Sequence, residues 1–320
     1  MRRVAALALS LLAAACATTP KSPEGFVFGV MGDAPYSKGE EKPFVEMIDR
    51  MNGEPLAFVI HVGDIKAGSH SRCTDELFRE RKAWFDASTH PLIYTPGDNE
   101  WTDCRRKTNG ADDPLERLEK LREVFFRGRS TLGRVELPTE ADDDAAPGCH
   151  SYPENRLWSY GRVRFATVNV PGSKNNEGFD AASDAEAQCR NAANRKWIDH
   201  AADLAEREGD RALVIATQAD PWLNDIPAYR ELIAHMGALA QRLHRPVMFV
   251  HGDTHTYHYD TPFKDATGAT VANALRLETY GSPFVGWVRV IVDPAEPALF
   301  IAQPMLHAIV PPFGGGSIPD

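Results

Sequence analysis

Four Gly-Asp pairs, each placed directly after a short apolar run, constrain this chain more than any other feature. The pairs and the runs before them are Gly32-Asp33 after 26–31, Gly63-Asp64 after 56–62, Gly97-Asp98 after 92–96, and Gly252-Asp253 after 247–250. Apolar runs of this length bounded by glycine predict buried strands. Carboxylates at the carboxyl ends of neighbouring strands share one sheet edge, where open α/β sheets bind their ligands. Because four carboxylates there would repel one another, we expect a metal centre between them.

The first residues predict an export signal rather than part of the fold. Two arginines are followed by an apolar stretch, 4–15, that is too short to span a bilayer. The stretch LAAAC that ends at Cys16 resembles a bacterial lipoprotein signal, in which the cysteine becomes the lipidated first residue. An ordinary secretory signal cut near Ala15 or Ala17 stays open as the alternative.

These signals divide the chain into three parts: a signal peptide over 1–15, a lipidated cysteine and polar tether over 16–24, and one domain over 25–320. We expect the protein in the bacterial cell envelope, lipid-anchored at the outer membrane or the periplasmic face, or secreted. Contact with a membrane is expected through the lipid anchor only.

Charge and cysteine content narrow the function classes. The formal net charge is −10, and no block of Lys and Arg stands out, so duplex nucleic acid is not an expected partner. Four cysteines follow Cys16, and an even number in an exported chain predicts two disulfides. We prefer Cys73–Cys104 and Cys149–Cys189, because the first pair flanks two of the Gly-Asp loops and the second brackets one insertion. The other two connectivities stay open.

Helical patterns alternate with the apolar runs. Apolar spacing predicts helices over 43–51 and 76–86, each between two Gly-Asp strands, which is a β-α-β-α-β order that favours a parallel core. Further expected helices and strands are helices over 114–127, 191–207 and 228–243, a hairpin of 157–160 and 163–170, a strand over 212–217, and antiparallel strands over 274–280, 285–292 and 298–303. We therefore expect an α/β domain of two facing sheets with helices outside.

The order of these motifs resembles the calcineurin-like metallophosphoesterases. The matching series is Gly32-Asp33, Gly63-Asp64, Gly97-Asp98-Asn99-Glu100, Gln218, and Gly252-Asp253-Thr254-His255. The family pattern is Asp-x-His, Gly-Asp-x-x-Asp or Tyr, Gly-Asn-His-Asp/Glu, a lone His, and Gly-His-x-His. The resemblance covers about 25–292. It implies a four-layer α/β/β/α sandwich of two mixed sheets that holds two metal ions about a bridging carboxylate.

The resemblance also implies a ligand set. Asp33, Asp64 and His255 would hold one metal. Asp64, Asp98, Gln218 and Asp253 would hold the other, with Asp64 as the bridge. For Asp33, Asp64 and Asp98 the alternative is a helix cap after a strand, since Asp favours such positions. Asp220 stays open as an alternative to Gln218.

Several positions depart from the family pattern in one direction. Asp98 stands where the family has Asn, while Gln218 and Asp253 stand where it has ligand histidines, so His255 is the imidazole ligand that remains. Oxygen-rich sites favour Mn²⁺, Mg²⁺ or Ca²⁺ over Zn²⁺, with iron as a further possibility.

The position of the family's catalytic histidine holds Asn99. An amide can donate a hydrogen bond to a phosphoryl oxygen but cannot supply a proton, and general acid help is worth roughly 10²–10⁴-fold. His251 and His258 are close in sequence to the last motif, and we take His251 with Asn99 as the candidate catalytic residues.

The function implied by the resemblance is hydrolysis of a small-molecule phosphate ester, a phosphomonoester or a phosphodiester, by a metal-activated water. The alternative is a degenerate, non-catalytic binding protein of the same fold at the cell surface, motivated by the missing ligand histidines and by Asn99.

Overall fold

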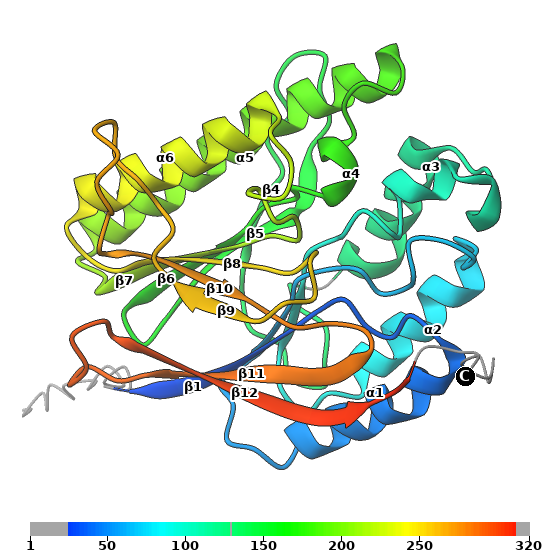
Figure 1. The fold of residues 1–320 in the computed structure, drawn as a ribbon, viewed down its shortest axis with the longest axis horizontal. Coiled ribbons are helices and arrows are strands. Elements are labelled where there is room, and N and C mark those ends of the chain that lie inside the picture. Colours follow the sequence, from blue (N-terminus) through cyan, green and yellow to red (C-terminus); the bar gives the residue numbers. More distant parts are fainter. Residues whose placement is uncertain (1–24, 129, 312–320) are drawn as a thin grey trace, which may run out of the picture.

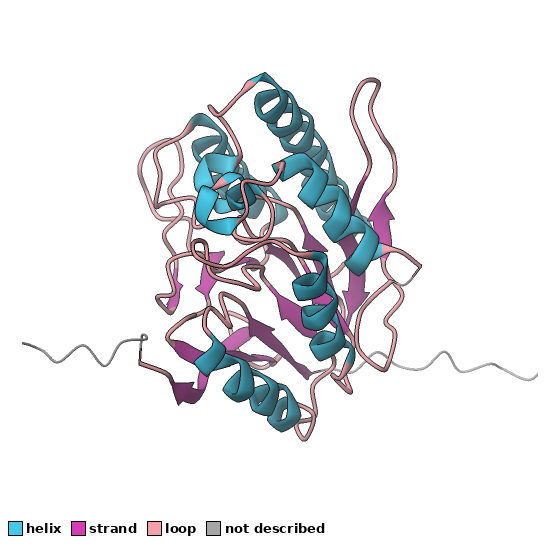
Figure 2. Cartoon of the chain, turned by 90° about the vertical axis from the view of Figure 1, so that its right-hand side faces the viewer, coloured by secondary structure: helices cyan, strands magenta, loops and turns pink. Residues whose placement is uncertain are grey.

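Two mixed β-sheets face each other in this computed structural model, which describes residues 25–128 and 130–311. The expected signal peptide (1–15) and the tether (16–24) lie outside the described residues. The first sheet has five strands in the order β12-β11-β1-β2-β3 and the second has seven in the order β4-β5-β6-β7-β8-β10-β9. Both sheets lie inside the molecule, with helices above and below them (Figure 1, Figure 2).

The first sheet combines a parallel core with an antiparallel edge. Its strands are β1 (Phe26–Met31), β2 (Val59–His61), β3 (Leu92–Tyr94), β11 (Phe284–Val292) and β12 (Phe300–Ile309). β1, β2 and β3 run parallel, while β11 pairs antiparallel with β1 and β12. The expected β-α-β-α-β order is confirmed.

The second sheet has a longer parallel core. Its strands are β4 (Glu140–Asp142), β5 (Tyr152–Tyr160), β6 (Val163–Thr167), β7 (Ala212–Ala216), β8 (Val247–His251), β9 (His258–Asp260) and β10 (Ala274–Glu278). β10 runs parallel to β8 and antiparallel to β9, so the expected antiparallel pairing of 274–280 holds on one side only. The short strand β9, which the sequence pattern did not indicate, supplies the antiparallel partner of β10.

Helices complete the four layers. They are α1 (Lys38–Met51), α2 (Asp75–Asp86), α3 (Pro114–Leu121), α4 (Gly172–Asn175), α5 (Ala181–Arg207) and α6 (Pro227–Leu243). One apolar cluster joins α1, α2 and α3 to the first sheet, a second fills the space between the sheets, and a third joins α5 and α6 to the second sheet. The expected four-layer α/β/β/α sandwich is therefore confirmed. Among the described residues no helix is long and apolar enough to cross a bilayer.

Helix starts were the least predictable boundaries. α1 begins at Lys38 rather than residue 43, because Glu40 accepts hydrogen bonds from the Tyr36 N–H and the Ser37 hydroxyl just before the helix. α5 begins at Ala181, where the Asp180 side chain accepts the Ser183 N–H. Polar capping, not apolar spacing, sets both starts.

Two disulfides join the expected partners. Cys73 pairs with Cys104 and Cys149 with Cys189. The first links the segment between β2 and α2 to the short helical turn Thr102–Arg105 after β3. Two disulfides are typical of proteins that fold in an oxidising compartment.

Candidate metal centre

The four Gly-Asp loops meet at one end of the two sheets. They follow β1, β2 and β3 of the first sheet and β8 of the second. Hydrogen bonds join them directly: the Asp33 N–H donates to Gly63 O (3.0 Å), the Asp253 N–H to Asp33 Oδ1 (3.0 Å), and the Asn99 N–H to Asp64 Oδ1 (3.1 Å). Loops that are far apart in the sequence thus contact one another and form one continuous surface, the floor of the candidate site.

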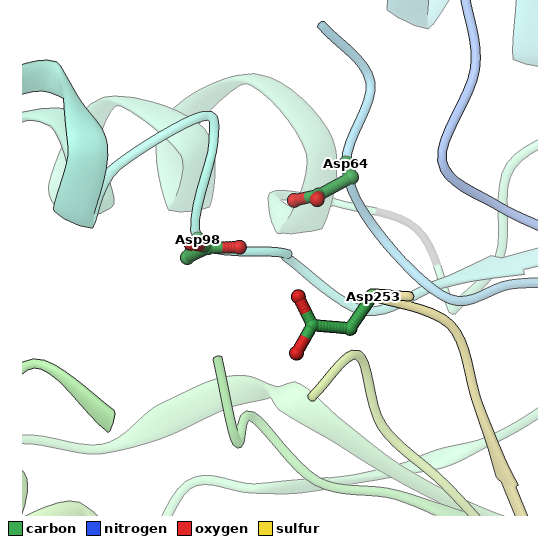
Figure 3. A group of neighbouring side chains, drawn as sticks. All are labelled: Asp64, Asp98 and Asp253. Carbon is green, nitrogen blue, oxygen red and sulfur yellow. The ribbon is translucent and has the colours of Figure 1, made fainter. Parts of the chain in front are cut away.

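Three carboxylates converge on this floor. Asp64, Asp98 and Asp253 each offer an oxygen, and these oxygens lie within 4.8 Å of one another. Figure 3 shows the three side chains reaching into a common space from separate loops. Burial raises the pKa of Asp64 well above its usual range and the charge of Asp98 raises it further. Burial and the charge of Asp98 raise the pKa of Asp253 to about 7. Because these carboxylates repel one another, a positive charge placed between them would stabilise their ionised forms.

The backbone is strained at four residues of the Gly-Asp loops. Asp33, Asp64, Asp253 and His255 have φ angles of +53°, +58°, +84° and +62°. Side chains other than glycine seldom adopt this region, and Asp does so more readily than most. Strain of this kind costs of order 1–3 kcal/mol per residue and concentrates at functional sites.

The glycines of the motifs make room for carboxylates from other motifs. A Cβ atom on Gly97 would lie 2.0 Å from Asp64 Oδ1, and one on Gly252 would lie 2.0 Å from Asp33 Oδ2. The pairs Gly97-Asp98 and Gly252-Asp253 therefore each supply a carboxylate and also clear the space for a neighbouring one.

Asp33 and His255 lie beside the three-carboxylate cluster. Asp33 Oδ2 is buried and has no hydrogen-bond partner among the described residues. His255 Nδ1 contacts the Ser282 carbonyl at 2.6 Å, so this nitrogen carries the proton and Nε2 keeps its lone pair. Nε2 faces Asp33 Oδ1 at 3.8 Å. A backbone carbonyl that fixes the tautomer in this way is typical of metal-ligating histidines.

This donor set fits a hard divalent cation. Carboxylate oxygens dominate it, one of them is buried and unpartnered, and the imidazole lone pair points to the same region. Such sets suit Mg²⁺, Mn²⁺ or Ca²⁺.

Tyr36 also lies at the candidate metal centre. Its hydroxyl donates to Asp64 Oδ2 (2.8 Å), accepts from Asn99 Nδ2 (2.9 Å) and lies 3.3 Å from His255 Nε2. The phenol oxygen therefore stands between Asp64 and His255. Its position three residues after Asp33 was the available signal.

Asn99 and Gln218 both direct amide N–H groups at Asp64. Asn99 Nδ2 donates to Asp64 Oδ2 at 2.8 Å. Gln218 Oε1 accepts the Gly172 N–H at 2.6 Å, which turns its Nε2 toward Asp64 Oδ2 (3.3 Å) and Asp253 Oδ1 (3.2 Å). In this orientation Gln218 offers the cluster hydrogen bonds, and its oxygen faces away.

His251 lies apart from the cluster. It ends β8 fully buried, and its ring packs 5.6 Å from Phe249 and 5.8 Å from Trp222 between the second sheet and its helices. Its Nδ1 contacts the carbonyl of Gly252 (2.9 Å), and burial lowers its pKa to about 3. A neutral imidazole in this packing is poorly placed to deliver a proton.

Two buried charged residues beneath the floor were not assigned a role from the sequence. Glu100 Oε1 accepts the Asp64 N–H (3.0 Å), the Gly97 N–H (2.7 Å) and the Tyr94 hydroxyl (2.8 Å), so it fixes two loops together. Lys66 donates to the carbonyl of Asn99 at 2.7 Å, and burial lowers its pKa to about 8. In the sequence, only their closeness to Asp64 and Asp98 within the motifs pointed to them.

Comparison with known proteins bears on the fold. No family model matches the sequence, and no curated protein matches it. A solved structure described as GAP50, the anchor in the inner membrane complex of Plasmodium, has a TM-score of 0.51 at 8% identity, covering 89% of each chain. Vacuolar Protein Sorting 29 from Cryptosporidium parvum has a TM-score of 0.33 at 11% identity, covering 88% of this chain and 97% of the other. At 8% identity the likeness to the first of these structures concerns the fold alone.

Proposed function

We propose that this chain is a divergent calcineurin-like metallophosphoesterase that hydrolyses a phosphomonoester or phosphodiester in a metal-dependent reaction. One observation carries the proposal: Asp64, Asp98 and Asp253 bring carboxylate oxygens within 4.8 Å of one another from three separate loops. Strained backbone at Asp64 and Asp253 supports it, because the fold holds these carboxylates together at a cost.

The residues divide into ligands and supports. Asp64, Asp98 and Asp253 would hold a divalent cation, and Asp33 and His255 with Asp64 would hold a second. A cation bound there supplies Lewis acidity toward a phosphoryl oxygen and lowers the pKa of a bound water. Asn99 keeps Asp64 and the Tyr36 hydroxyl in position through the two N–H groups of its amide.

The same proposal includes export. The lipoprotein-like start of the chain and its two disulfides support an envelope location, lipid-anchored through Cys16. A small-molecule phosphate ester outside the cytoplasm is then the substrate.

Replacing one carboxylate tests the cation site. Asp98 raises the pKa of both Asp64 and Asp253, so Asp98→Ala relieves repulsion and also removes the side-chain oxygens. Asn is not used here, because it is the residue that the family has at this position. We expect the metal-free variant to be more stable than the wild type. Its Mn²⁺ affinity and its turnover of p-nitrophenyl phosphate fall by more than about 100-fold, since losing even a partner that only orients a ligand costs 10–100-fold.

Calorimetric titration with Mn²⁺, Mg²⁺ and Ca²⁺, thermal unfolding and turnover of mono- and bis-p-nitrophenyl phosphate measure these effects. Asp225→Ala is the control, because Asp225 is 85% exposed and should change nothing. A wild type that binds no divalent cation, or an Asp98→Ala variant that keeps full turnover, contradicts the proposal.

A second candidate function, a non-catalytic binding protein of the same fold, has its own support. Asp64 accepts hydrogen bonds from the side chains of Tyr36, Asn99 and Gln218, which partly replace a cation as its partner. The likeness to a protein named as an anchor agrees with such a role. Absence of turnover with every metal, in a protein that is folded and disulfide-bonded, would favour it.

A further inference from the structure

A strained turn borders the acidic cluster. In the α4 turn the residues Ser173, Lys174, Asn175 and Asn176 have φ angles of +44°, +56°, +57° and +63°. Residues other than glycine visit this left-handed region singly as a rule, at roughly 1–2 kcal/mol each. Four in succession require strong support from the surrounding structure.

Buried side chains supply that support. Arg190 is fully buried, and it donates to Asn175 Oδ1 (2.7 Å) and to the Asn175 carbonyl (2.9 Å). The Tyr229 hydroxyl accepts the Asn175 N–H (3.2 Å) and donates to the Pro171 carbonyl (2.6 Å). The turn is therefore held rigidly against α5 and α6.

The turn lies directly against the carboxylates. A Cβ atom on Gly172 would lie 2.8 Å from Asp98 Oδ1 and 3.0 Å from Asp253 Oδ1. The next residue, Ser173, donates from its hydroxyl to Asp103 Oδ1 at 2.6 Å. Ser173 thus stands at the rim of the cluster.

Arg106 reaches the same rim from the other side. Its Nη1 donates to the Gly68 carbonyl (2.6 Å) and pairs with Asp103 Oδ2 (2.7 Å), while Nη2 contacts Ser173 Oγ (3.4 Å). A Cβ atom on Gly68 would lie 2.4 Å from Asn99 Oδ1 and 3.2 Å from Arg106 Nη1, so guanidinium and Asn99 border one small space. The Arg106 side chain is 46% exposed, which leaves part of the guanidinium open to a ligand.

We propose that Arg106, positioned by Ser173 and the strained turn, binds the non-bridging oxygens of a doubly charged phosphoryl group and thereby selects phosphomonoesters. This rests on the proposed phosphoesterase function. A guanidinium matches two phosphoryl oxygens in a fork. The exposed Lys174 on the turn adds a second positive charge at the rim. A phosphodiester has a single negative charge and one fewer non-bridging oxygen, so it gains less binding energy from Arg106 and from Lys174.

The test measures anion binding rather than turnover. Calorimetry of the Mn²⁺-loaded protein compares doubly charged inorganic phosphate with singly charged dimethyl phosphate. We expect Arg106→Gln to weaken phosphate binding about 10- to 100-fold, the loss of a charge-assisted hydrogen bond, and dimethyl phosphate binding far less. Arg106→Lys should recover part of the loss, and Ser173→Ala should show a smaller loss than Arg106→Gln.

Lys107→Gln is the matched control, because Lys107 is the adjacent exposed cation; it should leave both affinities unchanged. Unchanged phosphate affinity in a folded Arg106→Gln variant, or an equal loss for both anions, overturns the inference. Phosphate binding that depends on Arg106 in a protein without any turnover keeps the anion site and refutes the phosphoesterase function. Turnover together with phosphate binding that does not depend on Arg106 refutes the anion site and keeps the phosphoesterase function.

Discussion

At the scale of single residues, the glycines near the centre act on carboxylates that belong to other segments. Gly97 clears space for Asp64, and Gly252 does so for Asp33. In these two motifs the glycine therefore has a packing role beside the candidate ligand that follows it. It lets charged oxygens approach one another across loops without filling the space where a cation would bind.

Gly172 offers the sharpest test at this scale. In Gly172→Ala the new methyl group would meet Asp98 Oδ1 at 2.8 Å and Asp253 Oδ1 at 3.0 Å, so the carboxylates must move. We expect Mn²⁺ affinity to fall at least about tenfold, because displaced ligands lose their geometry, with little change in thermal stability. Titration calorimetry and thermal unfolding measure both quantities.

Gly53→Ala is the control for this substitution, because a Cβ atom there meets only the Arg50 carbonyl, at 3.4 Å. Unchanged Mn²⁺ affinity in a folded Gly172→Ala variant would mean that the three carboxylates do not share a ligand.

Much of the candidate site followed from short-range sequence pattern. Asp64, Asp98 and Asp253 each follow a strand and a glycine, and strand ends converge by topology alone. The orientation of Gln218 was not predictable, because the Gly172 N–H that fixes it comes from a distant segment. The place of the Tyr36 hydroxyl likewise depends on contacts between three loops.

At the scale of elements, one disulfide joins two segments that carry candidate site residues and the other does not. Cys73–Cys104 ties the segment before α2 to the turn after β3, and these segments carry Asp64 and Asp98. Cys149–Cys189 instead ties the segment before β5 to the first third of α5.

Removing each disulfide should separate stability from site geometry. Loop-closure entropy predicts a loss of about 4 kcal/mol for either Cys→Ser pair, since the two loops have similar lengths. We expect the Cys73→Ser, Cys104→Ser variant also to bind Mn²⁺ more weakly. The Cys149→Ser, Cys189→Ser variant should retain wild-type affinity. Denaturant unfolding and Mn²⁺ titration check both; equal affinities in the two variants would show that the first disulfide does not hold the site.

The elements themselves were predictable to different degrees. Apolar runs and helical spacing gave the parallel core β1-β2-β3 and the helices that cover it. The direction of β10 was not predictable, because a strand near the C-terminus can join either sheet edge, and its pairing with β8 is long-range. Nor did the pattern indicate β4 and β9, which have three residues each.

At the scale of the whole molecule, aromatic packing joins the two sheets. Phe28, Phe58 and Phe165 meet with ring centroids 5.0–5.4 Å apart, and Trp158 stacks on Phe165 at 5.2 Å. Aromatic pairs of this kind contribute about 0.5–1.5 kcal/mol each beyond their buried area. Because Phe28 and Phe58 belong to the first sheet and the loop before β2, and Phe165 to the second sheet, this cluster fixes how the two sheets face each other.

Buried histidine makes the stability of the whole fold depend on pH. His61 on β2 is fully buried beside Phe85 and Tyr94, accepts the Gly63 N–H, and has its pKa lowered from 6.5 to about 3 by burial. The unfolded chain therefore binds a proton below pH 6.5 that the folded chain does not bind until about pH 3. The contribution of a neutral His61 is complete above pH 6.5 and declines as pH falls, by about 2 kcal/mol between pH 7 and pH 5.

His61→Asn removes this titration while its Oδ1 can still accept the Gly63 N–H. The variant loses stability at every pH through lost packing against Phe85. Its free energy of unfolding should nevertheless fall less than that of the wild type between pH 7 and pH 5, by about the same 2 kcal/mol. Raised carboxylate pKa values at Asp33 and Asp64 act in the opposite direction in both proteins, so the difference between the two curves isolates His61. Urea unfolding across this pH range measures both curves, and His70→Asn, at an exposed histidine, is the control. If the free energies of unfolding of the wild type and of His61→Asn change in parallel with pH, His61 does not set the acid sensitivity.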